Sequence, residues 1–299
     1  MARTAARLPD GARITDYISL GVVAKTFGPE KIKRILVETG RQSVRERALP
    51  AQVAMYYSIA LALYMQVSCK EVLSCLLEGL QWLTKPGSRL RVAGKSGISQ
   101  ARTRLGVEPV KRLHDETVGP IASKSTRGAW YREWRLASLD GSTLDVADTK
   151  ENEGAFGRPG ASRGSSAYPR IRFVSLVENG THVLFGSRMG DYQTGEITLA
   201  KELAALYHER WDIEYALDEL KTHLRGSKIV LRSKTPELVR QEFYGLMMAH
   251  FAVRGLMHEA ALKADIDPDE LSFVHSVRVV RRKLPLFVAI PPSEAESVS

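Results

Sequence analysis

The spacing of apolar residues divides the chain into a helical part and a mixed part. Through residues 14–122, apolar residues recur at intervals of three and four, and no segment alternates convincingly like a strand. This spacing places apolar side chains on one face of an α-helix. The longest apolar run, residues 53–67, includes Ser58 and Gln66 and falls short of the ~18 apolar residues of a membrane-spanning helix. We predict a buried core helix there.

The pattern changes near Trp130, where strand-like segments begin. Residues 134–139 are rich in residues that favour strands and end at Asp140-Gly141. Residues 142–146 form a second short extended run. Because glycine and aspartate favour turns, Asp140 is expected at the end of a first strand.

The next segment combines a loop with a hairpin signal. Residues 151–169 are rich in glycine, serine, proline and arginine, which predicts a long loop. Residues 171–178 alternate, and a further β-rich run covers residues 181–187, with the turn dipeptide Asn179-Gly180 between them. Together with the strand before Asp140, these runs indicate a meander of about three strands.

Helical spacing then returns and continues to the C-terminal region. A helix is expected to begin after residues 190–199 and to run into residues 207–221 without a further strand. Thr235-Pro236 has the residue types of an N-cap and a first helical position, and it precedes a long apolar helix. A basic helical segment follows near the C-terminus.

Residues 207–221 carry a stripe of polar side chains. On an ideal helix, Tyr207, Arg210, Glu214 and Lys221 fall within an arc of about 60°. A tyrosine, two cations and a carboxylate on one face suit a site that handles phosphate. An ordinary amphipathic helix with an Arg210–Glu214 pair at i,i+4 gives the same pattern, so the residues alone leave both interpretations open.

The charge balance points to a polyanionic partner. Lys and Arg number 43 against 34 Asp and Glu, which gives a formal net charge of +9. A basic balance of this kind favours partners such as nucleic acid. Cys69 and Cys75 have no neighbouring histidine cluster, so reduced thiols are expected rather than zinc or disulfide chemistry. The N-terminal residues lack the apolar core of a signal peptide, and export is not expected.

Residues 96–105 have the composition of a recognition helix. Five polar or basic side chains lie near the start of this helix, where hydroxyl and backbone N–H groups can bind phosphate while glutamine and arginine reach base edges. The candidate DNA-binding residues are Ser96, Ser99, Gln100, Arg102 and Arg104. A solvated basic helix face is the other interpretation, and both remain open here.

Several blocks resemble bacterial DDE transposases of the insertion-sequence-four family. The spacing of Tyr207, Arg210, Glu214 and Lys221 resembles the family's signature helix. The block LDGSTLDVADTKENEGAFGRP resembles the segment around its first catalytic aspartate, which corresponds to Asp140. The segments SGISQARTRLG and LRSKTPELVRQEFYGLMMAHFAVRGLMHEAA also resemble family segments, in the family's order.

The resemblance implies an α/β fold in two parts. Residues 1–128 correspond to a helical N-terminal region that binds transposon ends. Residues 129–299 correspond to a ribonuclease H-like core with C-terminal helices. The family holds two divalent metals, normally Mg²⁺, with three carboxylates, which implies Asp140 and Glu214 as catalytic metal ligands.

The resemblance also implies further catalytic residues, partners and a location. Tyr207, Arg210 and Lys221 are expected to position the phosphates of the transposon end or to support the glutamate helix. The expected partner is double-stranded DNA, both the terminal inverted repeats and the target, bound by a homodimer. The expected location is the bacterial cytoplasm, at the nucleoid when DNA is bound, with no membrane association.

The sequence departs from the family pattern between residues 187 and 207. The second catalytic aspartate normally ends a later strand and precedes a β-rich insertion, and no such motif occurs here. Asp191, Glu196 and Glu202 are the available carboxylates, but Asp191 belongs to a segment that precedes the missing strand in the family. We expect an internal deletion, an incomplete core, an unpaired sheet edge and impaired catalysis.

Two functions follow from this departure. One is a DNA transposase that cleaves and transfers strands. The other is a catalytically defective remnant or regulator that binds transposon ends without cutting them.

Overall fold

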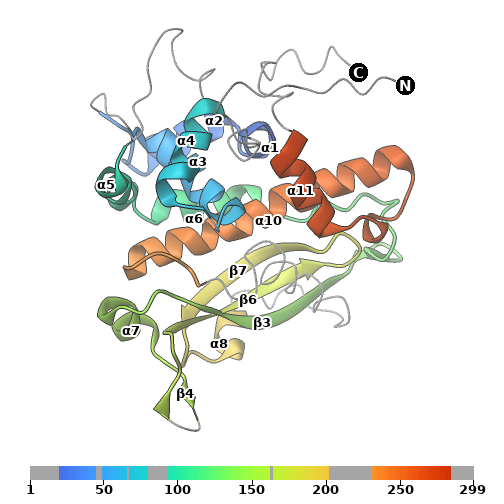
Figure 1. Ribbon diagram of the computed structural model, residues 1–299. Coiled ribbons are helices and arrows are strands. Elements are labelled where there is room, and N and C mark those ends of the chain that lie inside the picture. The colour runs from blue at the N-terminus through green and yellow to red at the C-terminus, as the bar shows by residue number, and fades with distance from the viewer. Residues whose placement is uncertain are drawn as a thin grey trace.

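Among the residues that the structure describes, six helices form a layer in the N-terminal part of the protein (Figure 1). The computed structural model describes residues 20–44, 49–65, 67–79, 93–161, 164–201 and 230–283. The six helices are α1 (Leu20–Thr26), α2 (Pro29–Glu38), α3 (Ala51–Leu63), α4 (Cys69–Gly79), α5 (Lys95–Leu105) and α6 (Glu108–Thr117). Among the described residues, no helix is both long and apolar enough to cross a membrane.

Helix α3 forms the centre of this layer. Every residue from Val53 to Leu63 is buried, which confirms the predicted core helix. Because the helix is surrounded, its tyrosines need partners inside the protein. The Tyr56 hydroxyl donates to the Phe27 carbonyl at 2.8 Å, and the Tyr57 hydroxyl donates to the Cys69 carbonyl at 3.0 Å.

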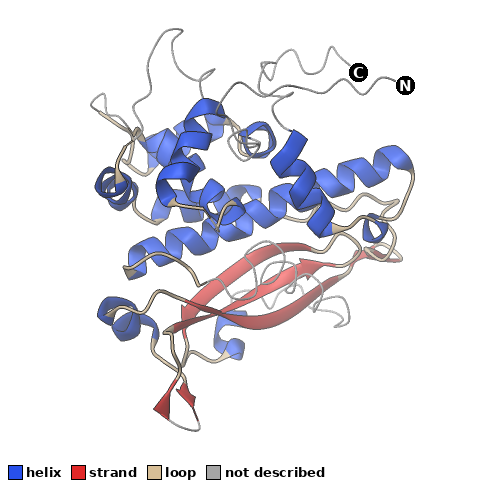
Figure 2. Cartoon of the chain, viewed as in Figure 1, coloured by secondary structure: helices blue, strands red, loops and turns tan. Residues whose placement is uncertain are grey.

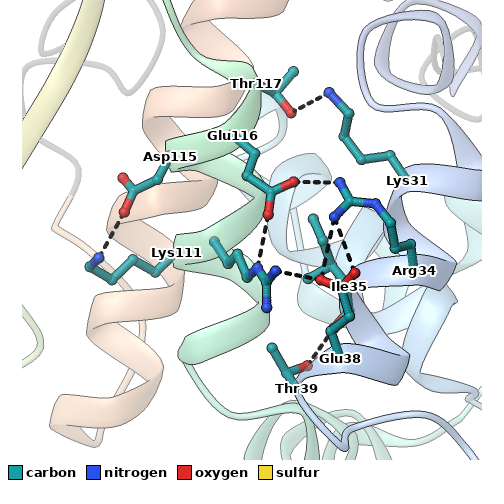
Figure 3. Close-up of polar contacts among 10 residues, drawn as sticks. Lys31, Arg34, Ile35, Glu38, Thr39, Lys111, Asp115, Glu116 and Thr117 are labelled. Atoms are coloured by element: carbon teal, nitrogen blue, oxygen red, sulfur yellow. Dashed lines mark hydrogen bonds and ion pairs between the residues drawn. The ribbon is translucent and has the colours of Figure 1, made fainter.

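A surface network of four charged residues joins α2 to α6 (Figure 3). Arg34 Nη2 lies 2.5 Å from one Glu116 oxygen, and Arg112 Nε lies 2.8 Å from the other. Both arginines also contact Glu38. Each guanidinium in this network is therefore matched by carboxylates of the same surface.

Asp115 of α6 is held by hydrogen bonds beside this network. His114 Nδ1 lies 2.9 Å from one carboxylate oxygen, and Lys111 Nζ lies 2.7 Å from the other. Burial raises the pKa of the Asp115 carboxyl, but the hydrogen bonds from His114 and Lys111 outweigh burial and lower the pKa to about 2.

The principal sheet is a three-stranded antiparallel meander in the order β3-β6-β7. Its strands are β3 (Ala137–Asp145), β6 (Arg170–Glu178) and β7 (Val183–Asp191), which confirms the predicted meander. The prediction that Asp140 ends a strand is wrong. Residues 137–145 all pair with β6, so the ladder continues through Asp140-Gly141 and the two predicted short runs form one strand.

The predicted long loop contains local structure. Helix α7 (Lys150–Phe156) begins after Thr149, whose hydroxyl accepts a hydrogen bond from the Asn152 backbone N–H at 3.2 Å. A small hairpin, β4 (Gly160–Ala161) with β5 (Gly164–Ser165), follows. A second hairpin, β1 (Trp130–Tyr131) with β2 (Trp134–Arg135), precedes the principal sheet. N-capping and short hairpins need few residues, which is why composition alone indicated a loop.

Helix α10 (Pro236–Ala264) lies between the helical layer and the sheet (Figures 1 and 2). On the sheet side, the rings of Phe243 and Phe173 have centroids 5.4 Å apart. On the other side, Gly245 approaches the Ser58 backbone of α3 so closely that a Cβ there would lie 2.9 Å from the Ser58 carbonyl carbon. The two parts expected at residues 1–128 and 129–299 therefore share one apolar core.

The remaining described helices cover other faces. The short α8 (Glu196–Ala200) lies against the sheet on the side opposite α10 (Figure 1). The 3-10 turn η5 (Pro268–Glu270) leads to α11 (Phe273–Lys283), which packs on α10.

Residues 231–234 tie the sheet to the helical layer. The Leu231 backbone N–H donates to the Asp145 carbonyl at 3.0 Å, and Leu231 forms a parallel bridge with Val146. The Arg232 guanidinium donates to the Val67 carbonyl at 2.5 Å and to the Leu61 carbonyl at 3.2 Å, satisfying carbonyls at the end of α3. In the order β3-β6-β7, β3 is an edge strand. Within the described residues, the bridge between Val146 and Leu231 is the pairing recorded next to this edge, just beyond the end of β3.

Candidate functional site

Helix α5 has a buried face and an exposed face. Ile98, Ala101 and Leu105 are buried against the core. The side chains of four predicted DNA-binding residues are exposed: Ser96, Ser99, Gln100 and Arg104. The structure therefore gathers four of the five on one accessible surface.

Arg102 differs from the other four because its side chain is 6% exposed. Its guanidinium donates to Gln241 Oε1 at 3.2 Å, to Ser233 Oγ at 3.1 Å and to the Leu238 carbonyl at 2.8 Å. Burial lowers the pKa of the Arg102 guanidinium, although the nearby Glu242 carboxylate raises it. The structure places Arg102 in a buried polar network between α5 and α10 rather than on the exposed face.

Asp140 lies in the middle of β3, among short polar side chains. It is the register partner of Ser175 on β6, so the two side chains share a face of the sheet. Ser175 Oγ in turn lies 2.7 Å from Ser187 Oγ on β7. The Asp140 carboxylate accepts a hydrogen bond from the Gly141 backbone N–H at 2.7 Å. A carboxylate and two hydroxyls thus cross the sheet in one row.

This row faces α10. Ser175 alternates with Phe173, and side chains two residues apart point to the same face of a strand. Phe173 contacts Phe243 of α10, so Asp140 is directed to the same side. The sequence signal was available, because serines occupy inward positions of β6 and β7 where apolar residues are usual; Ser175 is 1% and Ser187 0% exposed.

Asp191 lies too far along the sheet to share a metal with Asp140. Asp191 pairs with Ile171, whereas Asp140 pairs with Ser175 on the same strand. Four residues at about 3.3 Å each separate those partners, so the two carboxylates are roughly 13 Å apart along the strands. Ligand atoms lie about 2 Å from the metal that they bind, so carboxylates this far apart cannot bind the same metal ion.

Asp191 also has a local structural role. Its Oδ1 accepts hydrogen bonds from the backbone N–H groups of Gln193 and Thr194, both at 2.8 Å. Burial raises the pKa of the Asp191 carboxyl, but these hydrogen bonds outweigh burial and leave the pKa below its usual value. The carboxylate therefore closes the turn before α8.

Glu196 lies on the opposite face of the sheet from Asp140. A Cβ placed on Gly141 would lie 2.5 Å from the Glu196 carboxyl carbon, so Glu196 covers Gly141. Gly141 follows Asp140 in a regular strand, and successive residues point to opposite faces. Among the described residues, no group of three or more His, Cys, Asp or Glu side chains could hold a metal ion.

The predicted signature helix lies outside the described residues. Tyr207, Arg210, Glu214 and Lys221 all fall within residues 202–229, as does Glu202. On the described residues alone, the donors around Asp140 are one carboxylate and serine hydroxyls. They do not by themselves provide the three carboxylates that the resemblance implies for two Mg²⁺ ions.

Comparisons with known proteins agree on one family. Residues 17–115, which include most of the six-helix layer, match the family described as insertion element 4 transposase N-terminal. The chain is 26% identical to "Transposase InsG for insertion sequence element IS4" of Escherichia coli, over 86% of this chain and 81% of that protein. It is 24% identical to "Putative transposase InsZ" of the same organism, over 62% of this chain and 60% of that protein. No solved structure matches the chain.

The alignment with the first relative contains many positions that this chain lacks. It extends over 365 positions but covers 86% of the 299 residues here, which is about 257 residues. About 108 aligned positions therefore have no residue of this chain opposite them. This difference supports the internal deletion expected from the sequence.

Proposed function

We propose that this chain, whose residues 17–115 match the insertion element 4 transposase N-terminal family and which is similar to two transposases, binds the terminal repeats of an insertion element but is impaired in cleaving them. Two copies bring two ends together, so the bound form is a homodimer. Helix α5 contacts the duplex through the exposed side chains of Ser96, Ser99, Gln100 and Arg104.

The surroundings of Asp140 are the observation that carries this proposal. Asp140 keeps the central strand position of a first metal ligand, yet neither Asp191 nor Glu196 can act beside it. Two metal ions, when bound, stabilise the attacking and leaving oxygens of an in-line phosphodiester displacement. With Glu214 as the second ligand, the described residues supply no third carboxylate beside Asp140, which would weaken metal binding.

The remaining predicted residues act on the DNA in this proposal. Tyr207, Arg210 and Lys221 position the phosphates of the transposon end next to Asp140, since a phenol and two cations match a phosphodiester. The hydroxyls of Ser175 and Ser187 provide a polar environment next to the Asp140 carboxylate. The chain's own groups therefore bind and orient an end.

The test uses the purified full chain and a duplex containing the element's terminal repeat. We expect a gel shift at low salt and little or no strand cleavage with Mg²⁺. Asp140→Ala is expected to leave the gel shift unchanged, because Asp140 acts in cleavage. Mg²⁺-dependent cleavage that Asp140→Ala abolishes would show an active transposase and overturn the impairment. Absence of binding at low salt, where phosphate contacts are strongest, would overturn the proposal itself.

A further inference from the structure

A hollow beside α5 contains two arginines that have no carboxylate partner among the described residues. It has a volume of about 230 Å³ and lies between the connection from α2 to α3 and the C-terminal end of α5. Its polar lining comes from Arg41, Gln42, Ser43 and Arg104. No Asp or Glu lines it among the described residues.

Local backbone structure fixes this hollow. Gly40 adopts φ +64° after α2, and the Arg41 backbone N–H donates to the Leu36 carbonyl at 2.8 Å. Farther along, the Ser43 hydroxyl accepts a hydrogen bond from the Ala51 backbone N–H at 2.9 Å, at the start of α3. The connection is thus held at both ends.

The guanidinium groups in the hollow have spare donors. Arg41 Nη1 donates to the Arg104 carbonyl at 3.2 Å, which brings the connection against α5. This is the hydrogen bond that the Arg41 side chain makes within the described residues, and the exposed Arg104 side chain makes no hydrogen bond or ion pair there. A guanidinium has five N–H donors, so most remain available to a ligand.

The arginines of Figure 3 provide the contrast. The side chains of Arg34 and Arg112 are also partly exposed, but both form ion pairs with Glu38 and Glu116. Arg41 and Arg104 lie in the same helical layer, and no described carboxylate forms an ion pair with them. An anion is therefore attracted to the hollow rather than to the α2–α6 network.

The hollow continues into the exposed face of α5. Ser96, Gln100 and Arg104 are spaced by four residues, so they form one stripe along the helix. Arg104 belongs both to this stripe and to the lining of the hollow. A DNA strand whose phosphate occupies the hollow would run past the stripe, where the other side chains face the duplex.

We propose that Arg41 and Arg104 form a phosphate-binding site for the backbone of double-stranded DNA, which fixes the duplex against α5. This inference rests on the proposed DNA-binding function and adds Arg41, a residue outside the predicted recognition helix. Arginine suits the task because its planar donors match two phosphate oxygens. The site positions the duplex and does not read its sequence.

The test measures affinity for the terminal-repeat duplex by fluorescence anisotropy between about 50 and 300 mM salt. Over this range the Debye length shortens, so the contribution of phosphate contacts falls measurably. Arg41→Gln and Arg104→Gln are each expected to reduce the slope of log K against log salt by about 0.9 and to weaken binding about fivefold at 0.15 M. Arg34→Gln, the matched control, should leave the slope unchanged because Arg34 is already paired.

Further measurements separate folding and sequence reading from phosphate binding. Arg41→Lys keeps the positive charge and should retain most of the salt slope. If substitution of Arg41 acted by disrupting the fold, the lysine variant would lose binding as well. The same change in slope is expected on an unrelated duplex, because phosphates are common to all sequences. Unchanged slopes for both glutamine variants would overturn the inference while wild-type binding upholds the proposed function. An effect confined to the terminal repeat would also overturn it.

Discussion

Replacing Arg102 by alanine is expected to destabilise the protein rather than to act on DNA binding alone. The substitution removes all three hydrogen bonds that the guanidinium donates, to Gln241, Ser233 and Leu238. It also removes the positive charge near the buried Glu242 carboxylate, whose Oε2 accepts hydrogen bonds from Ser233 N and Oγ at 2.9 and 2.5 Å. The buried acceptors keep fewer partners, and the space of the side chain is left empty.

The magnitude follows from burial. Removing one member of a buried charged network costs about 3–5 kcal/mol, because the remaining charge loses its compensation. Hydrogen bonds from a charged donor contribute about 1.5–3 kcal/mol each, but the three share one network and do not add. We therefore expect a loss of about 4 kcal/mol, which at 2–4 °C per kcal/mol lowers the melting temperature by roughly 10 °C.

Thermal unfolding followed by circular dichroism tests this expectation. Arg104→Ala is the matched control, because Arg104 is on the same helix and exposed. A surface truncation of this kind changes stability by less than about 0.5 kcal/mol. If Arg102→Ala melted with the wild type while losing affinity for DNA, the assignment of Arg102 to the buried network would be refuted.

Two further substitutions test packing and pH dependence. Gly245→Ala should cost about 3 kcal/mol in urea unfolding, because the new methyl meets the Ser58 backbone, whereas Gly255→Ala, with no atom within 4 Å, should be neutral or stabilising. Because the pKa of Asp115 is lowered to about 2, the ionised carboxylate stabilises the fold above pH 4 by about 1 kcal/mol after allowance for solvent screening. The wild type should therefore be more stable than Asp115→Asn above pH 4, and this difference should disappear between pH 4 and pH 2. An advantage that persists at pH 2 would contradict this pKa.

The sequence predicted the elements whose pattern is local. Helix α3 and the hairpin of β6 and β7 follow from apolar spacing and turn residues, which act over a few positions. The strand through Asp140 was divided wrongly because glycine weakens a strand locally, whereas pairing of all nine β3 residues with β6 overrides that tendency. Turn residues could not report a partner about 30 residues away.

For Arg102, the apolar spacing of α5 indicated burial, whereas the charge of the side chain suggested exposure. Ile98, Ala101 and Leu105 define the apolar face of α5, and residue 102 follows Ile98 by four. The spacing therefore placed Arg102 on the buried face, although its charge favoured the exposed one. Its partner Gln241 is 139 residues away, so the network that compensates the buried charge could not be predicted.

The proposed loss of cleavage is compatible with retention of the fold in this architecture. Helix α10 buries one face against α3 and another against the sheet, and residues 231–234 anchor its start to the end of β3. The packing of α10 on α3 and the bridge between Leu231 and Val146 lie outside residues 187–207, where the sequence departs from the family. A deletion there would remove the strand that carries the second aspartate while leaving α5, Asp140 and their supporting core in place. A chain shortened in this way would keep the helices on which the proposed DNA binding rests, even where the proposed metal site is incomplete.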